Sequence, residues 1–112
     1  MNEQQAVEEF TRRLRTSQEK GWSSIRELLE EVEVDPESSA VAILYRDDVS
    51  LLITVVVATP ERMLEIELEY PPELDEENGM REAWIVAWND DVQRIRNENA
   101  DFVTTALSFL GY

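Results

Sequence analysis

The stretch Met63-Leu64-Glu65-Ile66-Glu67-Leu68-Glu69-Tyr70 alternates strictly between apolar and acidic side chains from its second residue onward. Successive side chains of a β-strand point to opposite faces, so this pattern predicts a strand over residues 63–70. The aliphatic and tyrosine side chains of one face are expected to belong to the hydrophobic core. The glutamates of the other face are expected to form a carboxylate stripe in contact with water.

The segment before this strand, residues 50–59, is apolar at nearly every position. A strand of that composition is covered on both of its faces. Asp47-Asp48 predicts a tight turn before it, and Pro60 predicts a turn after it because proline fixes φ for the second turn position. With a further apolar strand over residues 40–46, these segments predict an antiparallel meander.

Residues 81–88 fit two interpretations. Their β-branched and aromatic side chains favour a strand, whereas Ala83 and Ala87 favour a helix. We interpret the segment as a fourth strand, partly because Asn89-Asp90-Asp91 supplies the residues that usually begin a helix.

Two helices are predicted before the strands, over residues 3–20 and 25–33, where apolar residues recur at helical spacing. Gly21 is expected to end the first helix as a C-cap. Ser24 and Glu27 have the spacing of a capping box and are expected to begin the second. One long helix kinked at Gly21 is the alternative.

A C-terminal helix is predicted over residues 91–110, where apolar residues again repeat at steps of three and four. Asn97 and Asn99 interrupt this stripe, so the helix could be kinked or split there. The 112 residues are thus expected to form a single globular domain, 1–112. The fold class is α+β, a two-layer sandwich in which the four-stranded antiparallel meander is packed by the N-terminal and C-terminal helices.

The charge is strongly acidic, with 25 acidic against 10 basic residues and a net charge of -15. Such a field repels nucleic acid and anionic lipid, so we expect no direct binding to either. It favours a basic protein partner or serves solubility alone. Lys20 is the only lysine, a bias also found in proteins of salt-adapted organisms, so the acidity could be environmental.

No catalytic chemistry is indicated by the residue types. The chain has no histidine and no cysteine, and its three glycines are not grouped into a phosphate-binding loop. The segment from Asp75 does not fit a calcium-binding loop, because Gly79 and Val86 occupy positions 5 and 12, where that loop requires oxygen ligands. We therefore expect a protein that is not an enzyme and has no catalytic residues, metal site or cofactor.

No apolar run approaches the ~18 residues of a membrane-spanning helix. The N-terminus lacks the basic start and apolar stretch of a secretory signal, so a cytoplasmic location is expected.

The candidate binding residues are acidic and aromatic. The carboxylate stripe is expected to continue into the acidic segment after residue 72 as one anionic surface. Trp84 and Trp88 have the same parity, so both are expected on one sheet face, either in the core or beside the glutamates as binding anchors. The complete set is Glu65, Glu67, Glu69, Glu73, Asp75, Glu76, Glu77, Trp84 and Trp88.

These features favour a non-enzymatic protein-binding or inhibitor module that docks its carboxylate-rich face onto a basic protein. Immunity proteins, phage-encoded inhibitors and DNA mimics have this character, and their partners are nucleases or nucleic-acid-binding proteins. The alternatives are a chaperone or adaptor for another polypeptide, which would form a homodimer, and a housekeeping domain of a salt-adapted organism.

Overall fold

The computed structural model describes residues 2–72 and 79–112, and its four strands form one antiparallel sheet in the order β1-β2-β3-β4. The elements are α1 (Glu3–Thr16), α2 (Lys20–Glu31), the 3₁₀ helix η1 (Pro36–Ser38), β1 (Ala40–Asp47), β2 (Leu52–Ala58), β3 (Met63–Glu69), β4 (Trp84–Asn89), α3 (Val92–Glu98) and α4 (Ala100–Phe109). The predicted α+β class and the four-stranded meander are confirmed, including the strand interpretation of residues 81–88.

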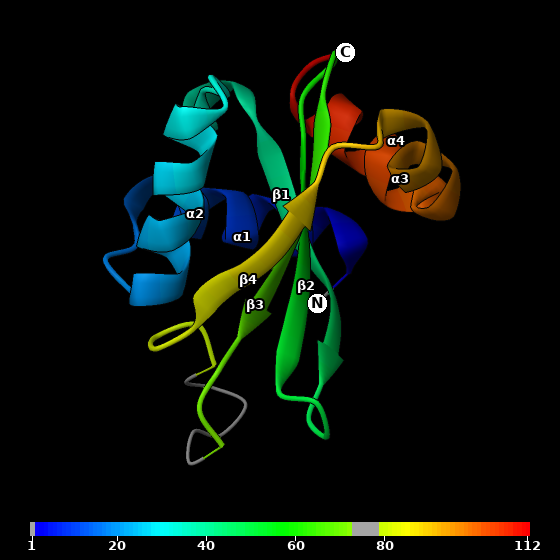
Figure 1. Ribbon diagram of the computed structural model, residues 1–112. Coiled ribbons are helices and arrows are strands. Elements are labelled where there is room, and N and C mark those ends of the chain that lie inside the picture. Colours follow the sequence, from blue (N-terminus) through cyan, green and yellow to red (C-terminus); the bar gives the residue numbers. More distant parts are fainter. Residues whose placement is uncertain (1, 73–78) are drawn as a thin grey trace.

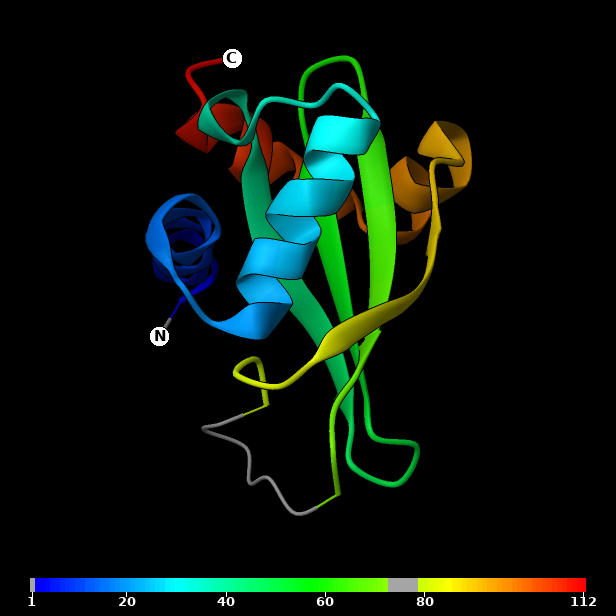
Figure 2. The same cartoon turned by 60° about the vertical axis from the view of Figure 1, so that its left-hand side comes forward.

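The aliphatic face of the sheet is covered by α2, which lies across it in Figure 2. Ile66 and Leu68 of β3 are fully buried there, together with Trp22 and Ile25 of α2. The alternation that predicted β3 therefore places its even-numbered residues in the core. Burying an aliphatic side chain of this size contributes about 1.5–3 kcal/mol, which makes this layer the main source of stability.

The opposite face of the sheet is covered over one half by α3 and α4, which lie on the other side of the strands from α2 (Figure 1). Val56 and Met63 are buried against Ile95 and Phe102 of these helices. The prediction that β2 is covered on both faces is therefore confirmed from Val55 to Ala58, whereas Leu52 and Thr54 lie in the half of the sheet that α3 and α4 leave uncovered. The expectation that the face opposite α2 is entirely in contact with water is wrong for this half, because the C-terminal helices pack on the second face and not beside α2.

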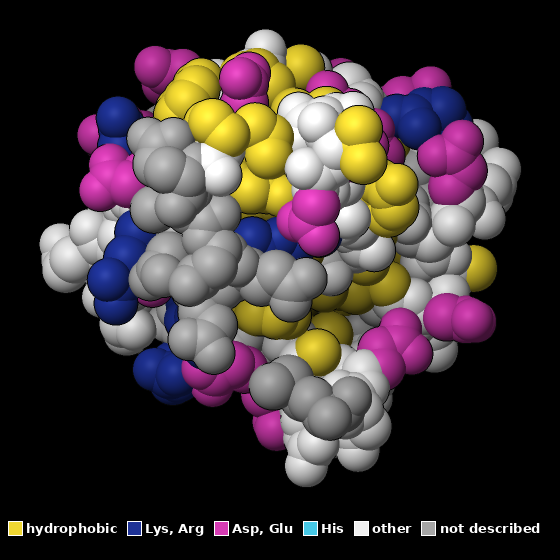
Figure 3. All heavy atoms as spheres, turned by 90° about the horizontal axis from the view of Figure 1, so that it is seen from below, with side chains coloured by type: hydrophobic (Ala, Val, Ile, Leu, Met, Phe, Trp, Pro, Cys, Tyr) yellow, Lys and Arg dark blue, Asp and Glu magenta, His cyan; other side chains and the backbone are white. Residues whose placement is uncertain are grey.

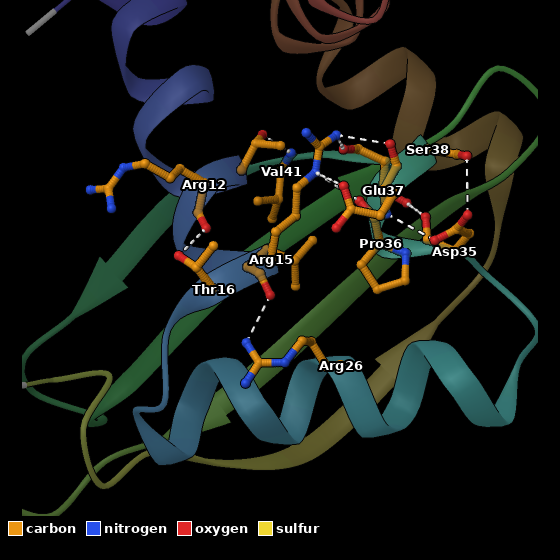
Figure 4. A network of polar contacts seen from close by, with 12 residues as sticks. Arg12, Arg15, Thr16, Arg26, Asp35, Pro36, Glu37, Ser38 and Val41 are labelled. Carbon is orange, nitrogen blue, oxygen red and sulfur yellow. Dashed lines mark hydrogen bonds and ion pairs between the residues drawn. The ribbon is translucent and has the colours of Figure 1, made fainter.

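The first helix, α1, lies beside β1 at one edge of the sheet. Side chains of α1 also hold the segment that leads into β1. The Thr11 hydroxyl accepts a hydrogen bond from the Val41 N–H of β1 (3.0 Å). The Arg15 guanidinium donates to the main-chain carbonyls of Pro36, Glu37 and Ser39, each at 3.1 Å (Figure 4). These bonds attach the η1 turn to the helix.

The second helix begins earlier than the sequence predicts, because a distant segment caps it. The N–H groups of Lys20 and Gly21 donate to the carbonyls of Arg81 (3.0 Å) and Met80 (2.8 Å). Gly21 therefore lies inside α2, and α1 ends at Thr16, so the predicted C-cap at residue 21 is wrong. The capping box at Ser24 is wrong for the same reason, since the first turn is already satisfied by the chain that leads into β4.

The other helix ends depart from the predicted bounds through local hydrogen bonds. At the end of α2, Glu33 has a left-handed φ of 62°, and the N–H of Val34 donates to the Leu29 carbonyl (2.8 Å). This is a Schellman ending with glutamate at the position that glycine usually occupies. The C-terminal helix is split in two at Asn99, whose side-chain amide donates to the Ile95 carbonyl (2.8 Å) and so ends α3.

Candidate functional site

Two rows of side chains cross the half of the sheet that α3 and α4 leave uncovered. Directly opposed residues of antiparallel strands point to the same face, so the register of the four strands identifies both rows. None of their members is buried. The first row is Tyr45, Thr54, Glu67 and Ala87, and the second is Asp47, Leu52, Glu69 and Trp84. We call these residues the open sheet face.

Two carboxylates occupy the middle of the open sheet face. Glu67 and Glu69 are half-buried, and neither forms an ion pair with any basic residue in the described ranges. Their neighbours on the adjacent strands are uncharged, namely Thr54, Ala87, Leu52 and Trp84. These carboxylates are therefore held in place by the sheet but not neutralised by it.

The third glutamate of the predicted stripe has a structural role. Glu65 lies at the border of the half covered by α3, where its carboxylate accepts from Arg94 (3.1 Å) and from the side-chain amide of Asn89 (3.0 Å). The carboxylate also raises the pKa of the Arg94 side chain through this hydrogen bond. Glu65 joins α3 to the sheet and is not part of the open sheet face.

The two tryptophans of β4 do not share a face. Trp84 lies opposite Glu69, whereas Trp88 lies opposite Ile66, because the pairing shifts by one residue between them and leaves Val86 as the extra residue of a β-bulge. The predicted common face is therefore wrong. By register Trp84 belongs to the open sheet face, beside a carboxylate, and Trp88 belongs to the α2 side, but both tryptophans border the groove between α2 and β4.

Aromatic side chains border the carboxylates at both edges of the sheet. Tyr45 of β1 is 61% exposed and Trp84 of β4 is 37% exposed. Such side chains provide large contact areas with few rotatable bonds and are enriched at binding hot spots. The sequence did not indicate Tyr45, because a register shift between Ile43 and Tyr45 changes the phase of β1 and no residue pattern marks that shift.

Asp47, at the end of the second row, caps its own turn. Its carboxylate accepts from the N–H groups of Val49 (2.9 Å) and Ser50 (3.1 Å). Hydrogen bonds from Ser50, and then from Val49, lower the pKa of the Asp47 carboxyl group. This aspartate therefore stays ionised and fixes the β1–β2 turn at the rim of the site.

A second cluster lies at the same end of the sheet on its α2 side. The Tyr70 hydroxyl donates to the Asp48 carboxylate (2.6 Å), and the Arg46 guanidinium lies 4.8 Å from the centre of the tyrosine ring. Burial, followed by the hydrogen bond to Asp48, raises the pKa of Tyr70. Arg46 is thus engaged on the opposite face from Glu67 and Glu69.

The remaining predicted contact residues, Glu73, Asp75, Glu76 and Glu77, lie outside the described residues. The described surface at this end of the molecule carries hydrophobic, acidic and basic side chains side by side (Figure 3).

The open sheet face brings together acidic, aromatic and apolar groups. It combines unneutralised carboxylates, a hydroxyl-bearing aromatic ring, an indole and a few aliphatic atoms. No group of three or more metal-ligating side chains is found among residues 2–72 and 79–112. No helix of the described chain is long and apolar enough to cross a membrane. Comparison with protein-family models, curated proteins and solved structures finds no match.

Proposed function

We propose that the protein is a non-enzymatic binding module whose open sheet face docks onto a basic protein. The observation that carries the proposal is the position of Glu67 and Glu69, half-buried between uncharged neighbours and without a cationic partner in the described chain. A lysine or arginine from another protein would supply the missing counter-charge. Tyr45 and Trp84 would make the apolar contacts on either side.

The use of arginine elsewhere in the molecule supports this interpretation. Arg94 is bound to Glu65 and Glu98, while Arg15 and Arg26 donate to main-chain carbonyls. Arg62 likewise donates to the Val32 carbonyl. These arginines are engaged in contacts that stabilise the fold, and none of the ion pairs between described residues involves Glu67 or Glu69.

Such a carboxylate-bearing face suits a partner whose own function requires a positive cleft. A nuclease or nucleic-acid-binding protein presents lysine and arginine where phosphates bind, and a carboxylate array is complementary to that surface. Electrostatic attraction would raise the association rate above the ~10⁵–10⁶ M⁻¹s⁻¹ of a neutral pair. An inhibitor of the immunity-protein or DNA-mimic kind fits this description best.

The test compares two variants of equal net charge. Glu67→Lys/Glu69→Lys reverses the carboxylates of the open sheet face, and Glu30→Lys/Glu61→Lys reverses two exposed glutamates away from it. Each protein is immobilised and exposed to host lysate and to purified basic nucleases. We expect the wild type and the Glu30/Glu61 control to retain the same basic protein, and the Glu67/Glu69 variant to lose it.

Retention should also fall steeply between about 50 and about 500 mM NaCl, because exposed charges are screened over this range. Equal loss of binding by both variants would mean that only the net charge matters. The acidity would then be a general property of the surface, as in a salt-adapted protein, and the proposal would be wrong.

A further inference from the structure

The strand β4 forms an open edge of the sheet. Among the described residues it pairs with β3 alone, and its outer side faces solvent. Trp84, Val86 and Trp88 are 37%, 45% and 43% exposed. An edge strand presents a row of unpaired N–H and C=O groups, and natural proteins usually protect it with lysine, proline, a β-bulge or a covering element; of these devices β4 has one bulged residue, Val86. The sequence of β4, Trp-Ile-Val-Ala-Trp-Asn, contains no charged residue and no proline.

The opposite edge of the same sheet, formed by β1, is covered by a helix. There α1 lies along β1, and the Thr11 hydroxyl pairs with the Val41 N–H at 3.0 Å. The Arg15 side chain reaches the carbonyl of Ser39, just before that strand, at 3.1 Å. One edge is therefore covered by a helix with specific main-chain contacts, and the other is left available.

Carboxylates lie near the β4 edge on both faces of the sheet, and the cation at its C-terminal end, Arg94, donates to Asn89 and is paired with Glu65 and Glu98. On the α2 side, a groove of about 390 Å³ lies between the helix and the strand, and its walls include Glu27 and Glu31 beside Trp84, Ile85 and Trp88. On the other side lie Glu67 and Glu69, one strand further in. A strand added to this edge would thus project its alternate side chains towards carboxylates above and below the sheet.

We propose that the basic partner contributes an extended segment that pairs with β4 as a fifth strand, with lysine or arginine on both of its faces. This inference rests on the proposed function, since it specifies how the basic partner is held. Main-chain hydrogen bonds to the β4 edge would provide affinity, and the carboxylates on both faces would select cationic side chains. Trp84 and Trp88 would pack against the aliphatic stems of those residues.

A second copy of the chain does not fit the same edge. Pairing β4 with β4 would bring two molecules of net charge -15 together, with Glu27, Glu31, Glu67 and Glu69 of each copy near those of the other. Like charges at short range oppose such pairing.

The test separates strand addition from attraction by charge alone. The probe is the heptapeptide Lys-Lys-Val-Val-Lys-Lys-Val, which as a strand places lysine on both faces, and its control is the same peptide methylated at alternate main-chain nitrogens on the edge that would face β4. Both peptides have the same charge and side chains, but the second cannot donate the hydrogen bonds of a paired strand. Affinity is measured by titration calorimetry, and hydrogen–deuterium exchange follows the amides of residues 84–89.

We expect the unmodified peptide to bind at least about tenfold more tightly than the methylated one and to slow exchange in β4. Glu27→Gln/Glu31→Gln should weaken its binding more than the equally charged control Glu30→Gln/Glu61→Gln.

Equal affinity of the two peptides, or no binding by either, would overturn strand addition. So would a dimer of the free protein with protected β4 amides, as detected by sedimentation. None of these results bears on the Glu67/Glu69 lysate comparison, so strand addition can fail while the proposed function stands. Conversely, the lysate comparison can fail while the peptide still binds to the β4 edge, and the two failures are therefore distinguishable.

Discussion

Gly21 lies where the first turn of α2 meets the chain entering β4, and its replacement by alanine tests that junction. A Cβ atom at this position would lie 2.5 Å from the Met80 carbonyl oxygen. Because this oxygen belongs to the main chain, no change of side-chain rotamer can relieve the clash. The segment before β4 would have to move away, and the hydrogen bonds from Gly21 to Met80 and from Lys20 to Arg81 would be lost.

The size of the effect follows from three contributions. Each lost hydrogen bond removes about 1 kcal/mol of stability, while alanine returns at most about 1 kcal/mol of helix propensity. The net loss is about 1 kcal/mol if water satisfies both N–H groups, and about 3 kcal/mol if the buried Gly21 N–H stays unpaired. With a urea dependence of about 1.5 kcal/mol per M, the unfolding midpoint falls by roughly 0.7–2 M.

The assay is equilibrium urea unfolding followed by tryptophan fluorescence, to which the buried Trp22 and the partly exposed Trp84 and Trp88 all contribute. The matched control is Ser23→Ala in the same turn of α2, which should change stability by less than about 0.5 kcal/mol. An alanine variant at position 21 that is as stable as the wild type, or more stable, would refute the reasoning, because it would mean that the helix start does not depend on Met80 and Arg81.

Two further changes test local features. Glu33→Gly should raise stability by about 1 kcal/mol, because the left-handed φ of 62° strains a residue that has a Cβ atom. Glu33→Ala, which removes the same carboxylate but keeps the strain, should give no such gain, and equal gains in urea unfolding would contradict this account. Asp47→Asn tests pH dependence. The folded-state pKa of Asp47 is lowered, so its ionised form stabilises the protein above the unfolded pKa of about 3.9, and this contribution is lost as pH falls through the folded value. The variant should be less stable than the wild type at pH 7, and the two should converge in acid. A difference that stays constant down to pH 2, measured by thermal unfolding at each pH with Glu61→Gln as control, would show that the charge of Asp47 is not what matters.

The strands could be predicted from the sequence because their side chains alternate between two faces with a period of two residues. Alternation places Leu64 and Ile66 on one side and Glu65 and Glu67 on the other, and this holds whatever packs against the sheet. The helix boundaries at Thr16 and Lys20 were not readable, because the first turn of α2 is capped by carbonyls some sixty residues further along the chain. No local signal in the sequence announces that contact.

The candidate site was predicted in part. Glu67, Glu69 and Trp84 lie together as carboxylates beside an aromatic ring. Glu65 is occupied by Arg94, which comes from a helix 29 residues away, and sequence spacing carries no information about that pairing. The separation of Trp88 from the site depends on a single bulged residue in β4. Parity arguments fail at such bulges, since one extra residue exchanges the two faces.

The position of α1 has a consequence for the order in which the protein can fold. Its Val7 belongs to the cluster that α4 covers, and its Leu14 belongs to the cluster that α2 covers. During synthesis α1 emerges before every element that it contacts, and α4, which packs against it, emerges after all of them. The part of α1 around Val7 therefore stays without the cover of α4 until that last helix has emerged, whereas Leu14 can pack against α2 earlier. Assembly of the native structure is therefore completed only when the final residues of α4 have left the ribosome.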